Sequence, residues 1–463
     1  MELTHGELVE LVIELRGVIA RQAIVIEELK AKLAQNSSNS SKPPSSDGPA
    51  KPKTKSNRTK SGRKPGGQPG HKGSGLKVDR EPNTIVVIEP NKCTCGCDLD
   101  GEPTFHADTK YVYDVEIVVT LTKYVIREAI CPECSSTVKP EVPAEVSGTV
   151  NYGHDLRALS VVLTQYACVS IDKTHKILHE LIGLPISTGT IKNIQSQFAG
   201  LTGATKEMIK QNLLNSPVVH ADETGVRVNG KTQWIHVASN SKYTLLKVHK
   251  KRGREGSEAG GVLPGYTGIL VHDCWRPYFG FDKLRHAVCC AHLLRELNAL
   301  IETGKHQWAS DMKKLLLEMK KVVEEYKFEN KTELSRYYRN KFKARYAAIL
   351  LQADETVTRS TTRKKTKAEN LLKRLNEYHE EIMRFTKDFD VPFDNNQAER
   401  DIRNVKVKQK VTGGYRSDDG AAEYADTISV IGTVVKFGQS VFNSVRGLFA
   451  GVVPNLGIAT ATE

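Results

Sequence analysis

Two acidic residues follow apolar segments in the centre of the chain, where their carboxylates can bind metal ions. Asp222 ends the run SPVVHAD, and Asp273 ends GILVHD. The period of two along a strand places Val218, His220 and Asp222 on one face, so Asp222 lies at the solvent end of a mostly apolar strand. A carboxylate there is costly unless it binds something. Taken singly, each aspartate is explained at least as well as a strand-end residue that caps a turn.

A third carboxylate, Glu399, lies in the polar segment DNNQAERDIRNVKVKQK. This segment predicts a helix that Asp394 or Asn395 caps, with Glu399, Arg403, Lys406 and Lys410 on one side. On this face a metal-binding glutamate would be followed by a row of cationic side chains that can bind phosphates. The alternative is an ion pair between Glu399 and Arg403 on a solvated helix, worth only about 0.3 kcal/mol.

Phosphodiester chemistry explains why three carboxylates would be brought together. In-line displacement at phosphorus uses two Mg²⁺ or Mn²⁺ ions about 4 Å apart, and such hard cations prefer oxygen ligands. Three carboxylates from separate elements can hold two ions of this kind. We therefore predict Asp222, Asp273 and Glu399 as the catalytic, metal-binding residues of one site.

The surrounding segments predict the elements that position these residues. Residues 217–250 alternate like a meander and contain Asn229-Gly230, a strong hairpin signal, so three consecutive antiparallel strands are expected. A buried strand through GILVH and a helix over about 286–301 follow. This order is the skeleton of a ribonuclease H-like catalytic domain, predicted over 213–303 and 387–438 and including an apolar helix near 421–437. The charged segment 304–386, with apolar stripes at helical spacing, predicts a helical insertion.

The N-terminal segments predict self-association and contact with phosphates. Apolar residues in residues 1–35 alternate in steps of four and three, which predicts a short coiled coil; an amphipathic helix packed on the body is the alternative. Residues 36–80 form a flexible linker rich in Ser, Pro, Gly and Lys. Its basic residues meet no acidic residue between Asp47 and Asp79, so we favour phosphate tracking over a solvated spacer. The coiled-coil seam is Leu8, Val12, Leu15, Ile19, Gln22, Ile26, Leu29 and Leu33, and the DNA-binding candidates in the linker are Lys51, Lys53, Arg58, Arg63 and Lys64.

Two further modules are expected before the catalytic domain. Strand-like runs such as TIVVIEP and YVYDVEIVVTLTKYVI bracket two cysteine groups, which predicts a zinc-ribbon-like module over 81–148. Residues 149–212 predict three short helices of a helix-turn-helix type, with Thr188 as a helix cap. Residues 439–463 remain as a C-terminal tail. The possible zinc ligands are Cys93, Cys95, Cys97, Cys131 and Cys134, and the DNA-binding candidates of the helices are Thr188, Thr190, Lys192, Arg400, Arg403, Lys406 and Lys410.

Composition narrows the class of partner. The 463 residues carry a formal net charge of +13, which favours a polyanionic partner, either nucleic acid or an anionic membrane surface. No run of eighteen or more apolar residues is present, and the N-terminus does not read as a secretory signal. We expect a soluble, cytoplasmic protein without a membrane partner. The nine cysteines fall in local groups, which suits metal binding or burial in a reducing compartment.

Several motifs resemble those of insertion sequence 66 family transposases, the TnpC-type DDE enzymes of prokaryotic mobile elements. The likeness spans nearly the whole chain: the N-terminal zipper, SSNSSKPPSSDGP with GGQPGHKG, the cysteine module, HADETGVRV, LVHDCW, CCAHLLREL and DNNQAER, in that order. It implies a ribonuclease H-like domain with Asp222, Asp273 and Glu399 as the metal-binding triad, interrupted by a helical insertion. Cys289 and His292 match the family's Cys-x-x-His element, for which we prefer a buried structural role.

The chain departs from the family pattern in two places. The first cysteine group reads CTCGCDL where a Cys-x-x-Cys-Gly knuckle is usual, and the tail after Gly438 lacks the usual ending. Four thiolates are still available from Cys93 or Cys97 with Cys95, Cys131 and Cys134.

The resulting hypothesis is a DNA transposase that binds the terminal inverted repeats of a mobile element, cleaves DNA and joins it to target DNA. The coiled coil would pair protomers, and helper proteins from the same element are possible partners. The protein would be associated with the nucleoid when bound to DNA. The alternatives are a nuclease of the same fold that cuts without joining, and a DNA-binding derivative of a transposase without catalytic activity.

Overall fold

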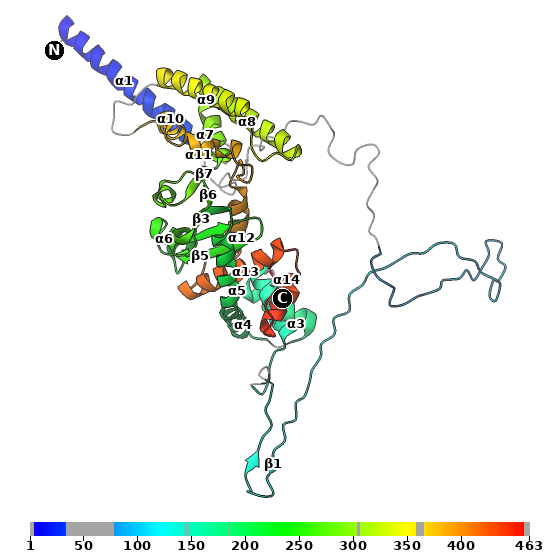
Figure 1. Ribbon diagram of the computed structural model, residues 1–463. Coiled ribbons are helices and arrows are strands. Elements are labelled where there is room, and N and C mark those ends of the chain that lie inside the picture. Colours follow the sequence, from blue (N-terminus) through cyan, green and yellow to red (C-terminus); the bar gives the residue numbers. More distant parts are fainter. Residues whose placement is uncertain are drawn as a thin grey trace. The chain divides into compact units, whose positions relative to one another are not determined.

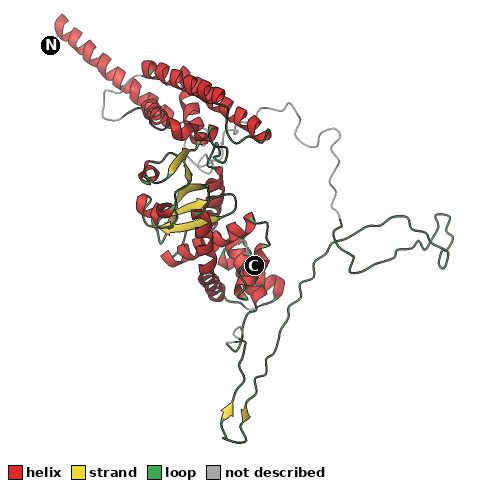
Figure 2. Ribbon diagram, in the orientation of Figure 1, coloured by secondary structure: helices red, strands yellow, loops and turns green. Residues whose placement is uncertain are grey.

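The computed structural model describes residues 4–33, 78–143, 146, 148–184, 186–302, 306–357 and 365–457 (Figures 1 and 2). The chain divides into two compact units, residues 55–123 and the remainder of the chain. The basic linker candidates from Lys51 to Lys64 lie outside the described residues.

A mixed five-stranded sheet forms the centre of the larger unit. Its strands are β3 (Val218–Val228), β4 (Lys231–Ser239), β5 (Thr244–His249), β6 (Ile269–His272) and β7 (Arg285–Val288), in the order β5-β4-β3-β6-β7. β3, β4 and β5 are consecutive antiparallel neighbours, as predicted, while β6 runs parallel to β3 and β7 parallel to β6. This order is compatible with a ribonuclease H-like core.

The β3–β4 hairpin turns at Asn229-Gly230, both of which have positive φ, 47° and 73°. A two-residue turn of this type needs left-handed backbone at both positions, which Asn and Gly supply most readily.

The helix expected from about His286 begins later in the structure. Residues 285–288 pair in parallel with β6 as β7, and α7 covers Cys290–Glu302. The prediction was wrong at its start because the RHAV segment completes the buried edge of the sheet, which local periodicity does not reveal.

Helices α12 (Asn396–Thr412) and α13 (Asp418–Lys436) pack on the antiparallel part of the sheet. Ile402 of α12 and Ile428 of α13 join Val226, Ile235 and Leu246 in one apolar cluster. The hydroxyls of Ser429 and Thr433 accept the backbone N–H groups of Leu246 and Thr244 at 2.8 and 3.1 Å. These bonds satisfy N–H groups of the edge strand β5 that would otherwise be free to pair with a further strand.

Five helices pack beside these elements. They are α2 (His154–Val161), continued by a π-helical turn (Val162–Tyr166), α3 (Ile171–Ile182), α4 (Thr188–Leu201), α5 (Gly203–Leu214) and α14 (Val441–Phe449). The cap of α4 is Ser187, whose side chain accepts the N–H of Thr190, so the prediction of Thr188 as the cap was wrong by one residue. α14 contacts α2 and α4, and the predicted tail therefore contains a packed helix. Short turns α6 (Arg254–Glu258), Leu263–Gly265 and Arg276–Gly280 connect the strands.

The predicted insertion is helical in its described residues. It contains α8 (Gln307–Phe328), α9 (Arg336–Thr356), α10 (Lys367–Glu377), α11 (His379–Met383) and a 3-10 turn (Arg384–Thr386). Leu315 and Met319 of α8 are fully buried, and the Tyr346 hydroxyl of α9 donates to the carbonyl of Leu375 at 2.8 Å. α7 packs against α8, so these helices share an apolar cluster with the β6–β7 side of the sheet.

The predicted N-terminal coiled-coil segment forms one helix, α1 (His5–Leu33). The seam residues Val12, Leu15, Ile19 and Ile26 expose about half or more of their surface. Such a row of exposed apolar side chains is typical of a helix that pairs with another helix.

The region around the cysteine groups has little regular structure. Within residues 78–143 the strands are β1 (Ala129–Ile130) and β2 (Thr137–Val138), and Lys92 forms an isolated bridge with Asp98. The strands predicted over TIVVIEP and YVYDVEIVVTLTKYVI are not formed. The prediction was wrong because residue type alone does not make a strand: the described residues place no pairing partner beside these runs, and their apolar side chains are exposed.

None of the helices in the described ranges is long and apolar enough to cross a membrane.

Candidate active site

Asp222 and Asp273 lie at the same end of two neighbouring parallel strands. The β3–β6 ladder pairs Val218 with Ile269 and His220 with Val271. Asp222, which lies within β3, and Asp273, the residue after β6, each follow the last of these pairs by two residues. Neighbouring strands lie about 4.8 Å apart. The two carboxylates predicted from sequence therefore lie at the carboxyl end of the parallel pair, where the charge of Asp273 acts on Asp222.

The electrostatics of Asp222 reflect this crowding. Burial raises the pKa of Asp222 well above its ordinary value, and the negative charges of Glu223, Asp273 and Glu399 raise it further. One oxygen of Asp222 accepts the N–H of Glu223 at 2.9 Å, and one oxygen of Asp273 accepts the N–H of Trp275 at 3.1 Å. Asp273 thus does cap a turn, as the simpler explanation of a strand-end aspartate predicts. It also acts on a second carboxylate, that of Asp222. Such a site favours a cation or a proton.

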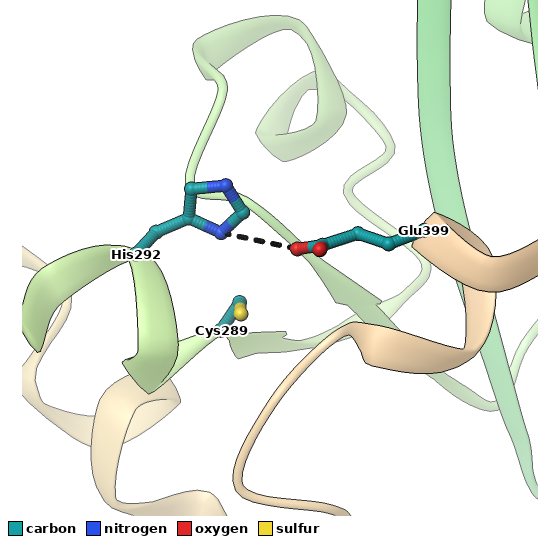
Figure 3. Close-up of side chains that lie close together, drawn as sticks. All are labelled: Cys289, His292 and Glu399. Carbon is teal, nitrogen blue, oxygen red and sulfur yellow. Dashed lines mark ion pairs between the residues drawn. The ribbon is translucent and has the colours of Figure 1, made fainter. Parts of the chain in front are cut away.

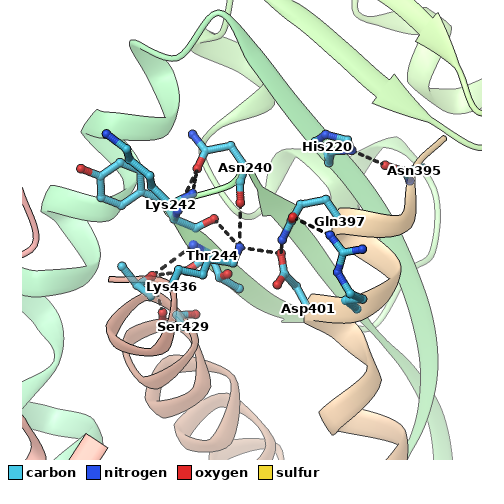
Figure 4. Close-up of polar contacts among 12 residues, drawn as sticks. His220, Asn240, Lys242, Thr244, Asn395, Gln397, Asp401, Ser429 and Lys436 are labelled. Atoms are coloured by element: carbon cyan, nitrogen blue, oxygen red, sulfur yellow. Dashed lines mark hydrogen bonds and ion pairs between the residues drawn. The ribbon is translucent and has the colours of Figure 1, made fainter. Parts of the chain in front are cut away.

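Glu399 enters the site from the first turn of α12, and Asn395 fixes the position of that turn. Asn395 is fully buried and is the residue before the helix. Its side-chain amide donates to the carbonyl of Ala221 and its side-chain oxygen bonds Nδ1 of His220, both at 2.8 Å (Figure 4). Because Ala221 precedes Asp222, these bonds tie the Glu399 helix to the strand that carries the first aspartate. Asn395 had been predicted only as a possible cap, and its side chain makes no cap bond.

The Glu399 carboxylate faces α7 rather than Arg403 of its own helix. Its Oε1 lies 3.9 Å from Nδ1 of His292 (Figure 3), and its Oε2 lies 3.8 Å from a guanidinium nitrogen of Arg295. Cys289 lies beside them, and the ligand atoms of Cys289, His292 and Glu399 all lie within 4.8 Å of one another. Burial raises the pKa of the Cys289 thiol to about 12, while backbone N–H groups of His292 and Asn395 oppose that shift.

Buried histidines support the strand end that carries Asp273. Nδ1 of His272 lies 3.2 Å from the N–H of Cys274, which can only donate. The neutral His272 ring therefore donates from Nε2 to Nδ1 of His286 at 3.2 Å, and His286 donates from Nε2 to the carbonyl of Phe281 at 3.3 Å. Burial lowers the pKa of both histidines, so the chain of bonds is one of neutral rings.

Glu223 is a buried carboxylate that the sequence reasoning did not single out. Its side chain is 1% exposed and accepts hydrogen bonds from Arg252 and, at 2.6 Å, from the Tyr278 hydroxyl. The Arg252 guanidinium lies over the rings of Trp234 and Trp275, at 4.9 and 4.3 Å. The alternation that places Asp222 on one face of β3 places Glu223 on the other, and that was the available signal.

The basic residues predicted to contact DNA differ in their surroundings. Arg400, Arg403 and Lys410 on α12 are exposed. Lys406 donates to the carbonyl of Gly225, and Lys192 is paired with Glu423. Thr188 is exposed, and the Thr190 hydroxyl lies 2.9 Å from that of Ser187.

A buried ion pair fixes the other side of α12. Lys436 pairs with Asp401 at 2.7 Å, and both side chains are at most 12% exposed (Figure 4). Lys436 also donates to the carbonyls of Asn240 and Tyr243, at 2.8 and 3.1 Å. Gln397 donates to Asp401 at 3.0 Å. These bonds connect α12 and α13 with the β4–β5 turn and hold the helix that carries Glu399.

The predicted zinc ligands lie in both units. Cys93, Cys95 and Cys97 belong to the unit of residues 55–123, where Cys93 and Cys97 share a tight turn. Cys131 and Cys134 belong to the other unit, and hydrogen bonds from Ser136 lower the pKa of Cys134 to about 7. Zinc binding by these five residues stays a prediction.

Comparison with known protein families assigns the chain to a family. The model described as "Transposase IS66 family" matches residues 149–423. This match covers more than half of the chain, and the chain belongs to the IS66 transposase family. A second model, a family of unknown function (DUF6444), matches residues 2–77.

Individual proteins resemble the chain more distantly. "Uncharacterized protein y4hP" of Sinorhizobium fredii (strain NBRC 101917 / NGR234) is 21% identical over 392 residues, which cover 77% of this chain and 69% of that protein. A chain in the cryo-EM structure of a simian T-cell lymphotropic virus intasome in complex with PP2A regulatory subunit B56 gamma is 14% identical. That likeness covers 44% of this chain and 74% of the other, with a TM-score of 0.15, and no argument is based on it.

Proposed function

We propose that this protein is a DDE transposase with a ribonuclease H-like catalytic domain, in which Asp222, Asp273 and Glu399 bind the catalytic divalent ions. The observation that supports the proposal is that Asp222 and Asp273 lie at the carboxyl end of the parallel strands β3 and β6, with the charges of Asp273 and Glu399 both acting on Asp222. Asp273 and Glu399 both raise the pKa of Asp222, although Glu399 lies 177 positions further along the sequence.

The donor set fits Mg²⁺ or Mn²⁺. Carboxylate oxygens are the ligands these hard cations prefer, and a cation would relieve the repulsion that Asp273 and Glu399 exert on Asp222. When bound, two such ions supply Lewis acidity at the phosphoryl group and lower the pKa of the attacking hydroxyl.

The chain's own residues supply position. Asn395 holds the start of α12 against β3, the neutral histidines His272 and His286 support the turn after β6, and Asp401 with Lys436 holds the far side of α12. A rigid arrangement of this kind keeps an attacking water or 3′-hydroxyl in line with the scissile phosphate. No side-chain nucleophile is required, because a hydroxyl of water or DNA attacks directly.

DNA binding follows from charge and position. The exposed Arg400, Arg403 and Lys410 extend from Glu399 along α12, and cations on this track would bind backbone phosphates. Residues 149–212 and the basic linker would bind the terminal inverted repeats, and α1 would pair two protomers.

The decisive experiment compares wild-type protein with Asp222→Asn on terminal-repeat DNA in Mg²⁺ or Mn²⁺. We expect the variant to bind DNA with wild-type affinity and to lose both cleavage and joining. Asp311→Asn, a change at a partly exposed position on α8 outside the candidate site, serves as the matched control and should retain both. Joining by the Asp222 variant would refute the assignment. Cleavage without joining by the wild type would identify a nuclease instead, and neither reaction would identify a DNA-binding derivative.

A further inference from the structure

Three side chains of different chemistry converge beside the carboxylate pair. Cys289 immediately precedes α7, His292 lies in its first turn, and Glu399 reaches them from α12 (Figure 3). Their sulfur, nitrogen and oxygen atoms lie within 4.8 Å of one another. Among the described residues this is the one group of three or more such side chains whose ligand atoms meet so closely.

Two of the three atoms are buried without a hydrogen-bond partner. Nδ1 of His292 and Oε1 of Glu399 face each other at 3.9 Å, which is beyond hydrogen-bond distance. Leaving a buried polar atom without a partner is costly, particularly when it belongs to a carboxylate. A cation between the two atoms would satisfy both.

The Cys289 sulfur has the surroundings of a metal-bound thiolate. It is fully buried and accepts the backbone N–H of Asn395 at 3.1 Å. Its neighbour Cys290, also fully buried, instead directs its sulfur at the carbonyls of Val288 and Ile382, at 3.8 and 3.6 Å. Cys289 therefore faces a donor and two candidate ligands, whereas Cys290 faces acceptors.

We propose that Cys289, His292 and Glu399 form a binding site for one thiophilic divalent ion, with Zn²⁺ as the ion that fits this donor set best. Sulfur and imidazole ligands select Zn²⁺ over Mg²⁺, which takes oxygen ligands. Three protein ligands leave the fourth position of a tetrahedral zinc to water. Binding releases the thiol proton of Cys289 to solvent.

Modest movement completes the site. Ligand atoms of tetrahedral zinc lie roughly 3.3–3.8 Å from one another, so the three atoms must close by about 1 Å, which rotation of the partly exposed Glu399 side chain can supply. A guanidinium nitrogen of Arg295 lies 3.3 Å from Nε2 of His292. Ligation through Nδ1 places the ring proton on Nε2, so Arg295 must leave that contact.

The ion would join α7 to α12 on either side of the helical insertion. It would hold Oε1 of Glu399 toward α7 and leave Oε2, which now faces Arg295, for other ligands. The site shares Glu399 with the proposed catalytic triad, but it takes a different class of ion and can be tested apart from transposition chemistry. Its test therefore uses metal binding and no DNA.

The test uses Co²⁺ as a spectroscopic probe on the full chain, with Cys93, Cys95, Cys97, Cys131 and Cys134 changed to Ser so that these cannot contribute. A sulfur-to-cobalt charge-transfer band reports a bound thiolate. We expect one Co²⁺ per chain with this band, displaced by Zn²⁺ but not by Mg²⁺. Cys289→Ser should abolish the band, and the matched control Cys290→Ser should retain it. His292→Ala should weaken Co²⁺ binding at least about tenfold.

Other outcomes would overturn the site. It is wrong if the cysteine-depleted chain shows no band, or if the band survives Cys289→Ser. A circular dichroism spectrum checks that each variant is folded. If Cys289→Ser does not fold, His292→Ala tests the site in its place. A wild-type affinity of the His292→Ala variant for Co²⁺ would then also refute the site. Asp222→Asn should leave the band unchanged, so a failure of the metal site is distinguishable from a failure of the proposed catalysis.

Discussion

The side-chain amide of Asn395 donates to the carbonyl of Ala221 at 2.8 Å, although 174 positions separate the two residues. The same side chain bonds His220, and the backbone N–H of Asn395 bonds the Cys289 sulfur. One buried residue thus connects the first catalytic strand, the start of α7 and the start of the helix that carries Glu399.

Asn395→Ala is expected to destabilise the fold by about 2–4 kcal/mol, because it removes two buried hydrogen bonds and leaves the Ala221 carbonyl and the His220 ring without partners. Urea unfolding followed by circular dichroism measures the change. Asn396→Ala, one residue along and only partly buried, should cost no more than about 0.5 kcal/mol. Equal losses in the two variants would contradict the role assigned to Asn395.

His236 should make stability fall in acid. Burial lowers the pKa of His236 to about 4 from an ordinary value of 6.5. His236 therefore binds a proton less readily in the folded state than in the unfolded state. The stability that the neutral His236 contributes is fully present above pH 6.5 and is lost as the pH falls from there through about 4. A shift of this size corresponds to about 3 kcal/mol. His236→Gln, which cannot titrate, should lose less stability than wild type between pH 7 and pH 4.5 in denaturant titrations. Parallel losses in the two proteins would exclude His236 as the cause.

Mn²⁺ should stabilise the folded protein, because an ion that binds the carboxylates of the native state relieves their mutual repulsion. At a Mn²⁺ concentration of 100 times the dissociation constant the gain is about 2.7 kcal/mol. Thermal unfolding with and without Mn²⁺ measures it. The double variant Asp222→Asn, Asp273→Asn should lose the response, whereas Asp311→Asn should retain it. A full response in the double variant would place the ions elsewhere.

Self-association should depend on the seam of α1. Ile19 lies on the predicted seam and Ile13 lies off it, yet the two side chains are almost equally exposed, at 63% and 65%. Ile19→Glu should dissociate the oligomer, because it places a charge in an apolar interface, and Ile13→Glu should leave the oligomer intact. Sedimentation velocity distinguishes the two. Dissociation by both variants, or by neither, would argue against the coiled coil.

Local pattern predicted the parts of the fold in which neighbouring residues decide the outcome. The alternation over residues 217–250 and the Asn229-Gly230 turn predicted the antiparallel strands correctly, and the apolar stripe with Leu315 and Met319 predicted a buried helix face. The same reasoning failed over TIVVIEP, where β-branched residues were taken for strands. Strand residues need a partner strand, and composition does not say whether one is present.

By itself, then, the sequence determined which residue types were available for chemistry and which faces of strands and helices carried them, because alternation and helical spacing are local properties of the chain. It placed Asp222, Asp273 and Glu399 on separate elements. The tertiary structure decided what each of them meets: the parallel pairing of β3 and β6 brings the aspartates to the same end of the sheet, and the packing of α12 turns Glu399 toward His292 and Arg295. It also engaged Lys192 with Glu423 and Lys406 with the Gly225 carbonyl. Contacts between residues a hundred or more positions apart follow from how whole elements pack, and no local pattern contains that information.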